Sequence, residues 1–151
     1  MVTPWRGLSR QKPIWEQEIR RHIPRAESRV ATKVLFGPSG HAYVYLIYGV
    51  HYCLNISAEE EGTAGCVLIR AVEPVSGISQ PTNGPGKLTK AMDITLAQND
   101  CDLTSGPITV LKDRTSEDPW PIAVSPRIGI TKSVDLPLRF HVSGNRFVSR
   151  G

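Results

Sequence analysis

Residues 34–56 read VLFGPSGHAYVYLIYGVHYCLNI and decide the kind of fold that we expect. Two runs rich in aromatic and aliphatic side chains, residues 43–48 and 50–56, are separated by Gly49. Two β-prone runs that pivot on a glycine are typical of a β-hairpin. A hairpin tip is not covered by its own sheet, so we expect Tyr48 to be exposed to solvent.

Shorter elements are predicted outward from this hairpin. Residues 66–72 favour a third strand, residues 73–86 favour a loop rich in proline and glycine, and a short helix is expected over about residues 87–93. Because strands outnumber helices, we predict an α+β fold with a mainly antiparallel sheet, in a single domain spanning residues 1–151. The remaining expected elements are a short helix over residues 13–23 and strands at residues 108–112, 122–124 together with 128–130, and 138–142.

The composition is that of an ordinary globular protein, with 151 residues of which 40% are hydrophobic and 21% charged. The longest strongly apolar stretch, residues 42–50, is too short to cross a bilayer, and no secretory signal is predicted. We therefore expect no membrane association, and a location in the cytoplasm and nucleoid, or in the nucleus of a eukaryote. Eight of the 18 Lys and Arg residues fall in residues 1–33, against three Glu, within a net charge of +4. This basic bias permits a nucleic-acid partner without requiring one.

The spacing of cysteine and histidine predicts neither disulfides nor a metal site. The three cysteines form no CxxC pair, so reduced thiols are expected. The histidines show no ligand spacing with cysteine or with one another, so we predict no metal. The residues concerned are Cys53, Cys66, Cys101, His22, His41 and His51.

Three features are candidates for a binding site, and each has a structural alternative. Asn55 lies in an apolar strand, where its amide either makes a core hydrogen bond or tests the edge of a ligand. Arg70 closes an apolar run, either as an ion-pair partner, for example of Glu73, or as a cation aimed into a site. The turn of residues 83–88 precedes a helix, so Gly86 and Lys87 either bind a phosphate or only mark a turn.

Five blocks of this sequence, in order, strongly resemble the alkyladenine (3-methyladenine) DNA glycosylase family, over about residues 32–151. The resemblance implies the family's α+β domain, a curved antiparallel sheet like the C-terminal domain of methionyl-tRNA formyltransferases. The blocks are residues 34–55 (quoted above to residue 56), VLIRAVEP at 67–74, TNGPGKL at 82–88, SPRIG at 125–129 and PLRF at 137–140.

The resemblance also implies a role for particular side chains. Tyr48 would fill the base stack after a damaged nucleotide is flipped out, and Tyr45 would stack on the flipped base. Asn55 would crowd the exocyclic amine of an undamaged guanine. Arg70 would help to hold the attacking water and the DNA backbone, and His22 falls near the place of a pocket histidine. The implied reaction is hydrolysis of the N-glycosidic bond of an alkylated purine in double-stranded DNA, by a monomer without cofactors.

The family's catalytic glutamate is not recognisable in this chain. The family carries it in a Glu-Thr-Glu-Ala-Tyr-like segment, and the corresponding neighbourhood here, residues 10–15, reads RQKPIW. The nearest carboxylates are Glu16 and Glu18. Three hypotheses follow. The chain is an active glycosylase with a displaced glutamate, a catalytically impaired or truncated family member that retains DNA binding, or a non-enzymatic nucleic-acid-binding module.

Overall fold

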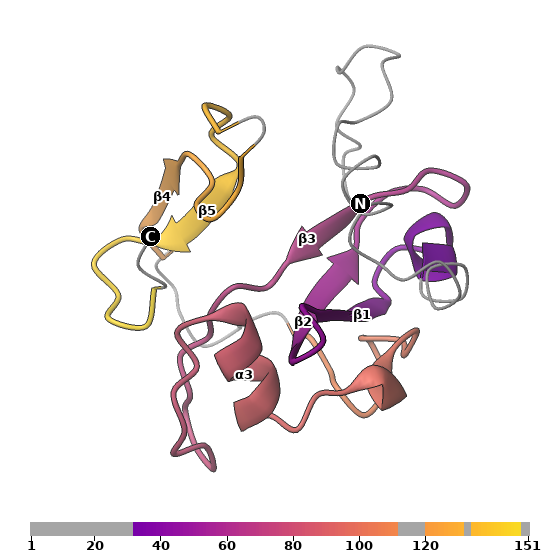
Figure 1. The fold of residues 1–151 in the computed structure, drawn as a ribbon, viewed down its shortest axis with the longest axis horizontal. Coiled ribbons are helices and arrows are strands. Elements are labelled where there is room, and N and C mark those ends of the chain that lie inside the picture. Colours follow the sequence, from indigo (N-terminus) through magenta and orange to yellow (C-terminus); the bar gives the residue numbers. More distant parts are fainter. Residues whose placement is uncertain (1–31, 112–119, 132–133, 149–151) are drawn as a thin grey trace.

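The computed structural model describes residues 32–111, 120–131 and 134–148 (Figure 1). A three-stranded sheet has the order β1-β2-β3, and a separate two-stranded sheet pairs β4 with β5, with every pairing antiparallel. The α+β class predicted from the sequence is confirmed for these residues. The elements are η1 (Thr32–Phe36), β1 (Ala42–Ile47), β2 (His51–Ser57), β3 (Cys66–Leu68), α3 (Pro85–Ala91), η2 (Leu96–Gln98), β4 (Ile122–Ser125) and β5 (Arg139–Val142).

The hairpin of β1 and β2 forms where the sequence predicts it. Tyr48 and Gly49 both have positive φ, 54° and 68°, and the amide of Val50 donates to the carbonyl oxygen of Ile47 at 3.2 Å. Two positive φ angles at the centre of such a turn match the twist of the strands on either side. The expected exposure of Tyr48 is confirmed, since 81% of its surface is accessible.

The three-stranded sheet has two different faces because side chains alternate along a strand. On one face, Val44 and Leu54 pack into a core with Leu88 of α3, and Figure 1 shows that helix beside β2. The opposite face carries polar, aromatic and thiol side chains beside η1 and Ala64. The register places Tyr43, Tyr45, Cys53, Asn55 and Cys66 on this second face, which we call the pocket face.

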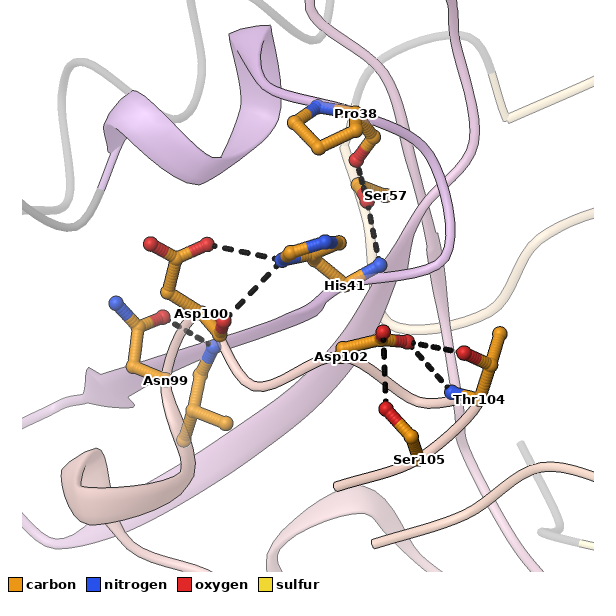
Figure 2. A network of polar contacts seen from close by, with 9 residues as sticks. Pro38, His41, Ser57, Asn99, Asp100, Asp102, Thr104 and Ser105 are labelled. Atoms are coloured by element: carbon orange, nitrogen blue, oxygen red, sulfur yellow. Dashed lines mark hydrogen bonds and ion pairs between the residues drawn. The ribbon is translucent and has the colours of Figure 1, made fainter.

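The outer edge of β1 is covered by the segment of residues 99–103. The amide of Ala42 donates to the carbonyl of Cys101 at 2.9 Å, and the amide of Asp100 donates to the carbonyl of Ala42 at 2.7 Å. Figure 2 shows the His41 ring turned toward Asp100, with its Nδ1 3.2 Å from a carboxylate oxygen. These bonds protect part of an edge that would otherwise offer itself to another strand.

A local turn stabilises the chain just after this edge. The Asp102 carboxylate accepts hydrogen bonds from the Thr104 amide and hydroxyl, both at 2.7 Å, and from the Ser105 hydroxyl at 3.1 Å (Figure 2). These donors hold the pKa of Asp102 below its usual range, the Thr104 hydroxyl most strongly. The carboxylate therefore stabilises its own turn.

Helix α3 begins and ends for local reasons. Pro85 occupies its first turn, where the missing amide hydrogen has no intrahelical partner to lose. The Thr89 hydroxyl donates to the Tyr52 carbonyl at 3.0 Å, which ties the helix to β2. Asp93, with φ of 52°, lies just past its end. The expected helix is confirmed, two residues earlier than the predicted 87–93.

Three predicted strands differ from the structure. The third strand stops at Leu68 instead of residue 72, because the backbone beyond Ile69 turns away from β2 and the Val72 amide donates to the Thr82 carbonyl at 3.3 Å. Arg70 lies in this turn and donates to the carbonyl of Ile128 at 3.4 Å. The described part of the expected strand at 108–112 is irregular, with Ile108 packed against the core. The expected strand at 128–130 is also absent, and Gly129 there has φ of 72°, outside the β region. The expected helix at residues 13–23 lies outside the described residues.

The β4–β5 hairpin points its apolar face outward, and it stands apart from the three-stranded sheet (Figure 1). Val124 pairs with Phe140, and their exposed fractions are 53% and 66%. The alternate positions, Ser125, Arg139 and His141, are polar and half-buried. The usual pattern of an amphipathic hairpin on a core is therefore inverted here.

Candidate functional site

The register of the sheet places the predicted pocket residues Tyr45 and Asn55 on one face. Tyr45 pairs with Cys53, and Asn55 pairs with Tyr43 on one side and Leu68 on the other. Burial raises the pKa of the Cys53 thiol, while the Tyr45 hydroxyl and the charge of Arg70 oppose that rise. The sequence-predicted residues Tyr45, Asn55 and Arg70 therefore gather on and beside the pocket face.

Asn55 is 4% exposed and held in one orientation from two strands. Its Nδ2 donates to the carbonyl oxygen of Tyr43 at 3.1 Å. Its Oδ1 accepts from the thiol of Cys66, with sulfur and oxygen 3.8 Å apart. Burial raises the pKa of this thiol to about 11, so Cys66 remains a protonated donor at neutral pH. The core hydrogen bond considered for Asn55 is present, and it fixes how the amide faces its surroundings.

Tyr43 and Tyr45 form an aromatic wall, with ring centroids 5.4 Å apart and planes inclined by 30°. Burial raises the pKa of both phenols above the ordinary value, so both hydroxyls keep their protons. The Tyr43 hydroxyl is buried and has no hydrogen-bond partner among the described residues. Tyr43 itself is fully buried and packs in a core cluster with Val34, Leu35 and Ala64.

Arg70 supplies positive charge beside the pocket face. Its Nη1 donates to the Ile128 carbonyl at 3.4 Å, which joins the end of β3 to the segment after β4. Burial lowers its pKa, and the neighbouring charge of Arg139 lowers it further, but a guanidinium stays protonated in proteins. The carboxylate of Glu73, offered by the sequence as its partner, accepts from Asn145 at 2.7 Å.

The predicted phosphate contacts lie next to the strand that follows the hairpin tip. A Cβ atom at Gly86 would lie 3.0 Å from both Cβ and Cγ of His51, so only glycine fits there without movement. Lys87 is exposed, and its ammonium group donates to the side-chain oxygen of Asn83 at 3.1 Å. The close approach of α3 to β2 thus places Gly86 and Lys87 near the beginning of β2.

Two residues that the sequence interpretation passed over belong to this site. Tyr43 shares the alternation of Tyr45, and that parity alone could have placed it on the pocket face. Cys66 contributes through a contact between strands that no local pattern reveals. The predicted residues His22, Glu16 and Glu18 lie outside the described residues.

Two features, a metal-binding cluster and a membrane-spanning helix, are absent from the described residues. These residues contain no group of three or more His, Cys, Asp or Glu side chains placed to hold a metal ion. None of their helices is long and apolar enough to cross a membrane.

The sequence profile of the methylpurine-DNA glycosylase family matches residues 21–146. The chain belongs to this family. The match begins earlier than the resemblance near Thr32 and includes His22, whereas Glu16 and Glu18 precede it.

Similar proteins carry the provisional name 3-methyladenine DNA glycosylase. The one from Methanoculleus marisnigri is 44% identical over 132 residues, covering 78% of this chain and 69% of the relative. Those from Rhodopseudomonas palustris and Bradyrhizobium diazoefficiens are 42% and 46% identical, over 78% of this chain and 62% and 63% of their own lengths. The chain therefore spans about two thirds of the length of these methylpurine-DNA glycosylase relatives.

Proposed function

We propose that this chain is a base-excision repair glycosylase that flips an alkylated purine of the 3-methyladenine type out of double-stranded DNA and hydrolyses its N-glycosidic bond. The observation that carries the proposal is the gathering of Tyr45, Asn55 and Arg70 on and beside one sheet face, next to a hairpin with an exposed Tyr48. Membership of the methylpurine-DNA glycosylase family and the names of its relatives support the same activity.

Each side chain has a physical task in this proposal. Tyr48 enters the stack from the minor groove and occupies the space of the flipped nucleotide. The flipped base then stacks on Tyr45, and an alkylated purine with positive charge gains a cation–π attraction from that ring. Asn55, held by Tyr43 and Cys66, presents a fixed amide that excludes the exocyclic amine of guanine.

The cationic groups hold the nucleic acid in register. Arg70 contacts the backbone near the flipped nucleotide and helps to place the attacking water. Lys87 and the Gly86 amide meet another phosphate of the duplex. His22 completes the base pocket, and Glu16 or Glu18 is the candidate general base. A purine made cationic by alkylation leaves readily, so one base and a tight pocket suffice without metal or organic cofactor.

The whole-protein proposals follow from the same assignment. The chain forms one domain over residues 1–151, its sheet is curved as in the C-terminal domain of methionyl-tRNA formyltransferases, and it works as a monomer. It acts where DNA is held, in the cytoplasm and nucleoid, or in the nucleus of a eukaryote.

A second candidate is a family member that binds DNA but turns over poorly. The observation that favours it is the chemistry of the pocket face and of Arg70 beside it: these described residues supply phenols, thiols, an amide and a guanidinium, none of which is a carboxylate. Binding and orientation need only these groups, whereas activation of water needs a base.

One pair of measurements separates the candidates. Binding is titrated on duplexes with and without an abasic-site analogue, and excision is followed in single turnover on 3-methyladenine and hypoxanthine substrates. Preference for the abasic duplex with excision supports the glycosylase, and preference without excision supports the impaired member. Equal affinity for undamaged duplex and for single-stranded RNA would overturn both in favour of a general nucleic-acid-binding module.

A further inference from the structure

The β4–β5 hairpin turns a polar face inward, which calls for an explanation. Ser125 pairs with Arg139, and Ala123 pairs with His141, so these four residues share one side of the ribbon. All four are half-buried, while on the other side Ile122, Val124 and Phe140 are exposed and Val142 is half-buried. Burying polar and charged side chains stabilises a two-stranded sheet less than burying the apolar side chains on its other face would. A task for the polar side accounts for this orientation.

The inward polar side lies close to Arg70. Arg70 Nη1 donates to the Ile128 carbonyl at 3.4 Å, and Arg139 Nη1 donates to the Ser125 hydroxyl at 3.3 Å. Ser125 and Ile128 are only three residues apart, so both guanidinium groups contact the same short segment at the end of β4. Burial lowers the pKa of Arg70 first, and the charge of Arg139 lowers it further, which agrees with two cations near each other.

His141 adds an unsatisfied polar atom to this side. It lies two residues after Arg139 on β5, so both side chains point to the same side of the ribbon. Its Nδ1 is buried and has no hydrogen-bond partner among the described residues. Buried polar atoms normally find a partner, so this one marks a place where a ligand group or water fits.

We propose that Ser125, Arg139 and His141, together with Arg70, form a binding site for one backbone phosphate of the DNA; we call it the hairpin phosphate site. Two neighbouring guanidinium groups concentrate positive charge and N–H donors at one place, and a phosphodiester accepts charge-assisted hydrogen bonds from such donors. Guanidinium forks match phosphate oxygens in geometry, and Ser125 holds the fork of Arg139 in place. This inference rests on the proposed action on DNA and adds a contact from the C-terminal hairpin.

In this proposal, a bound DNA phosphate helps to hold the β4–β5 hairpin in place. Its apolar side contributes nothing to the contact and stays exposed, as observed for Val124 and Phe140. The phosphate joins Arg70, two residues after the end of β3, to Arg139 of β5.

The test measures how duplex affinity depends on salt. Arg139→Gln removes one proposed phosphate contact, and Arg146→Gln is the matched control, because Arg146 is an exposed arginine stacked at 4.9 Å over Phe147. Affinity for a duplex with an abasic-site analogue is measured between low and moderate salt. Loss of one phosphate contact lowers the slope of log affinity against log salt by about 0.9.

We expect this loss of slope in Arg139→Gln and little change in Arg146→Gln. Arg139→Lys keeps the charge, so the slope returns while the affinity recovers only in part. His141→Gln lowers affinity roughly three- to tenfold, as for one hydrogen bond. Thermal unfolding of each variant shows whether it is folded. If Arg139→Gln does not fold, His141→Gln and Arg139→Lys test the proposal in its place.

Two outcomes overturn the proposal, and they differ. If the wild type prefers abasic DNA but Arg139→Gln and His141→Gln leave slope and affinity unchanged while lowering the unfolding temperature, the residues are structural and only the hairpin phosphate site is wrong. If the wild type shows no preference for abasic DNA and no salt dependence, the proposed function fails together with it.

Discussion

Asn55 and Tyr43 face each other across the ladder of β1 and β2, and the Asn55 side-chain amide donates to the Tyr43 carbonyl oxygen at 3.1 Å. The thiol of Cys66 approaches the other end of the same amide, with its sulfur 3.8 Å from Oδ1. Three strands thus hold one buried polar group. A side chain proposed to discriminate between bases gains from such restraint, because a rotating amide would present donor and acceptor equally.

Replacing Asn55 separates its structural and its selective roles. Asn55→Ala removes a buried hydrogen bond and should lower the free energy of unfolding by about 1–2 kcal/mol, measured by urea denaturation. Asn55→Asp should cost more at neutral pH, because an ionised carboxylate cannot donate to the Tyr43 carbonyl. Its penalty should shrink as pH falls, since burial raises the pKa of the introduced carboxyl and the protonated form donates again.

The same variants bear on base discrimination. With Asn55→Ala, affinity for duplexes with an unpaired guanine should approach that for an unpaired hypoxanthine. A wild-type ratio that survives the substitution would show that Asn55 is only a core residue. An Asn55→Asp penalty that is constant between pH 4 and 7 would contradict the hydrogen-bond assignment itself.

The Cys66 thiol gives the protein an alkaline pH dependence of known sign. Burial raises its pKa from 9.0 to about 11, so the folded state keeps this proton after the unfolded chain has lost it. Stability from this group therefore falls as pH rises from about 9 to 11, by at most about 3 kcal/mol. Cys66→Ser keeps a donor without that titration and should gain relative to wild type over this range. Unfolding curves at pH 8 and 10.5 test this, with Cys101→Ser as the control for loss of a thiol.

The hairpin and its pocket residues are predictable from sequence because the relevant signals are local. β-prone runs around Gly49 determine the strands, and alternation within each strand groups Tyr43 with Tyr45 and Cys53 with Asn55, whereas the register that puts the two groups on one face comes from the turn. The short helix is also expected from local signals, although Pro85 places its start two residues before the predicted residue 87. Each of these features depends on residues within a few positions of one another, where backbone preferences and side-chain alternation act directly.

The remaining features depend on contacts distant in sequence. Residues 108–111 are apolar enough for a strand, yet Ile108 serves the core without any ladder. The third strand ends early where Arg70 reaches Ile128, a partner 58 residues away. The alternation of β4 and β5 predicts an apolar and a polar side but not which one faces inward. No local pattern links Cys66 to Asn55, either.

Tyr48 should matter for DNA and hardly at all for folding. A tyrosine with φ of 54° occupies a strained backbone region that glycine adopts freely. The free energy of unfolding of Tyr48→Gly should therefore differ from that of the wild type by no more than about 1 kcal/mol. Loss of the inserted ring should weaken binding to abasic DNA by about 1–3 kcal/mol, roughly 5- to 150-fold. Fluorescence anisotropy with intact and abasic duplexes measures this, and Tyr52→Phe, away from the tip, is the control. Unchanged preference for the abasic duplex in Tyr48→Gly would remove the wedge assignment.

The contact of Gly86 with His51 should appear as energetic coupling. Alanine usually stabilises a helix relative to glycine, but here its Cβ would lie 3.0 Å from the His51 Cβ and Cγ. Gly86→Ala should therefore cost about 1 kcal/mol in the wild type and less in His51→Ala, which keeps the Cβ contact but removes the contacts with Cγ and Nδ1. A double-mutant cycle should give a coupling of at least about 0.5 kcal/mol. Equal effects in both backgrounds would show that α3 shifts freely away from β2.

Catalysis should be the weakest property of this chain. The pocket residues Tyr45, Asn55 and Arg70 orient a flipped base, but orientation does not activate water. General-base help is worth about 10²–10⁴-fold, and Glu16 and Glu18 lie outside the part of the chain that matches the family. We expect excision of hypoxanthine, a neutral leaving group, to be undetectable, and excision of cationic 3-methyladenine to be slow. Single-turnover assays on both substrates test this, with Glu16→Gln and Glu18→Gln measured beside the wild type; if neither carboxylate acts as the general base, neither substitution changes the rate. A fast wild-type rate that falls by a hundredfold or more in one of these variants would instead identify that glutamate as the base, and would show that a carboxylate displaced in sequence still reaches the pocket.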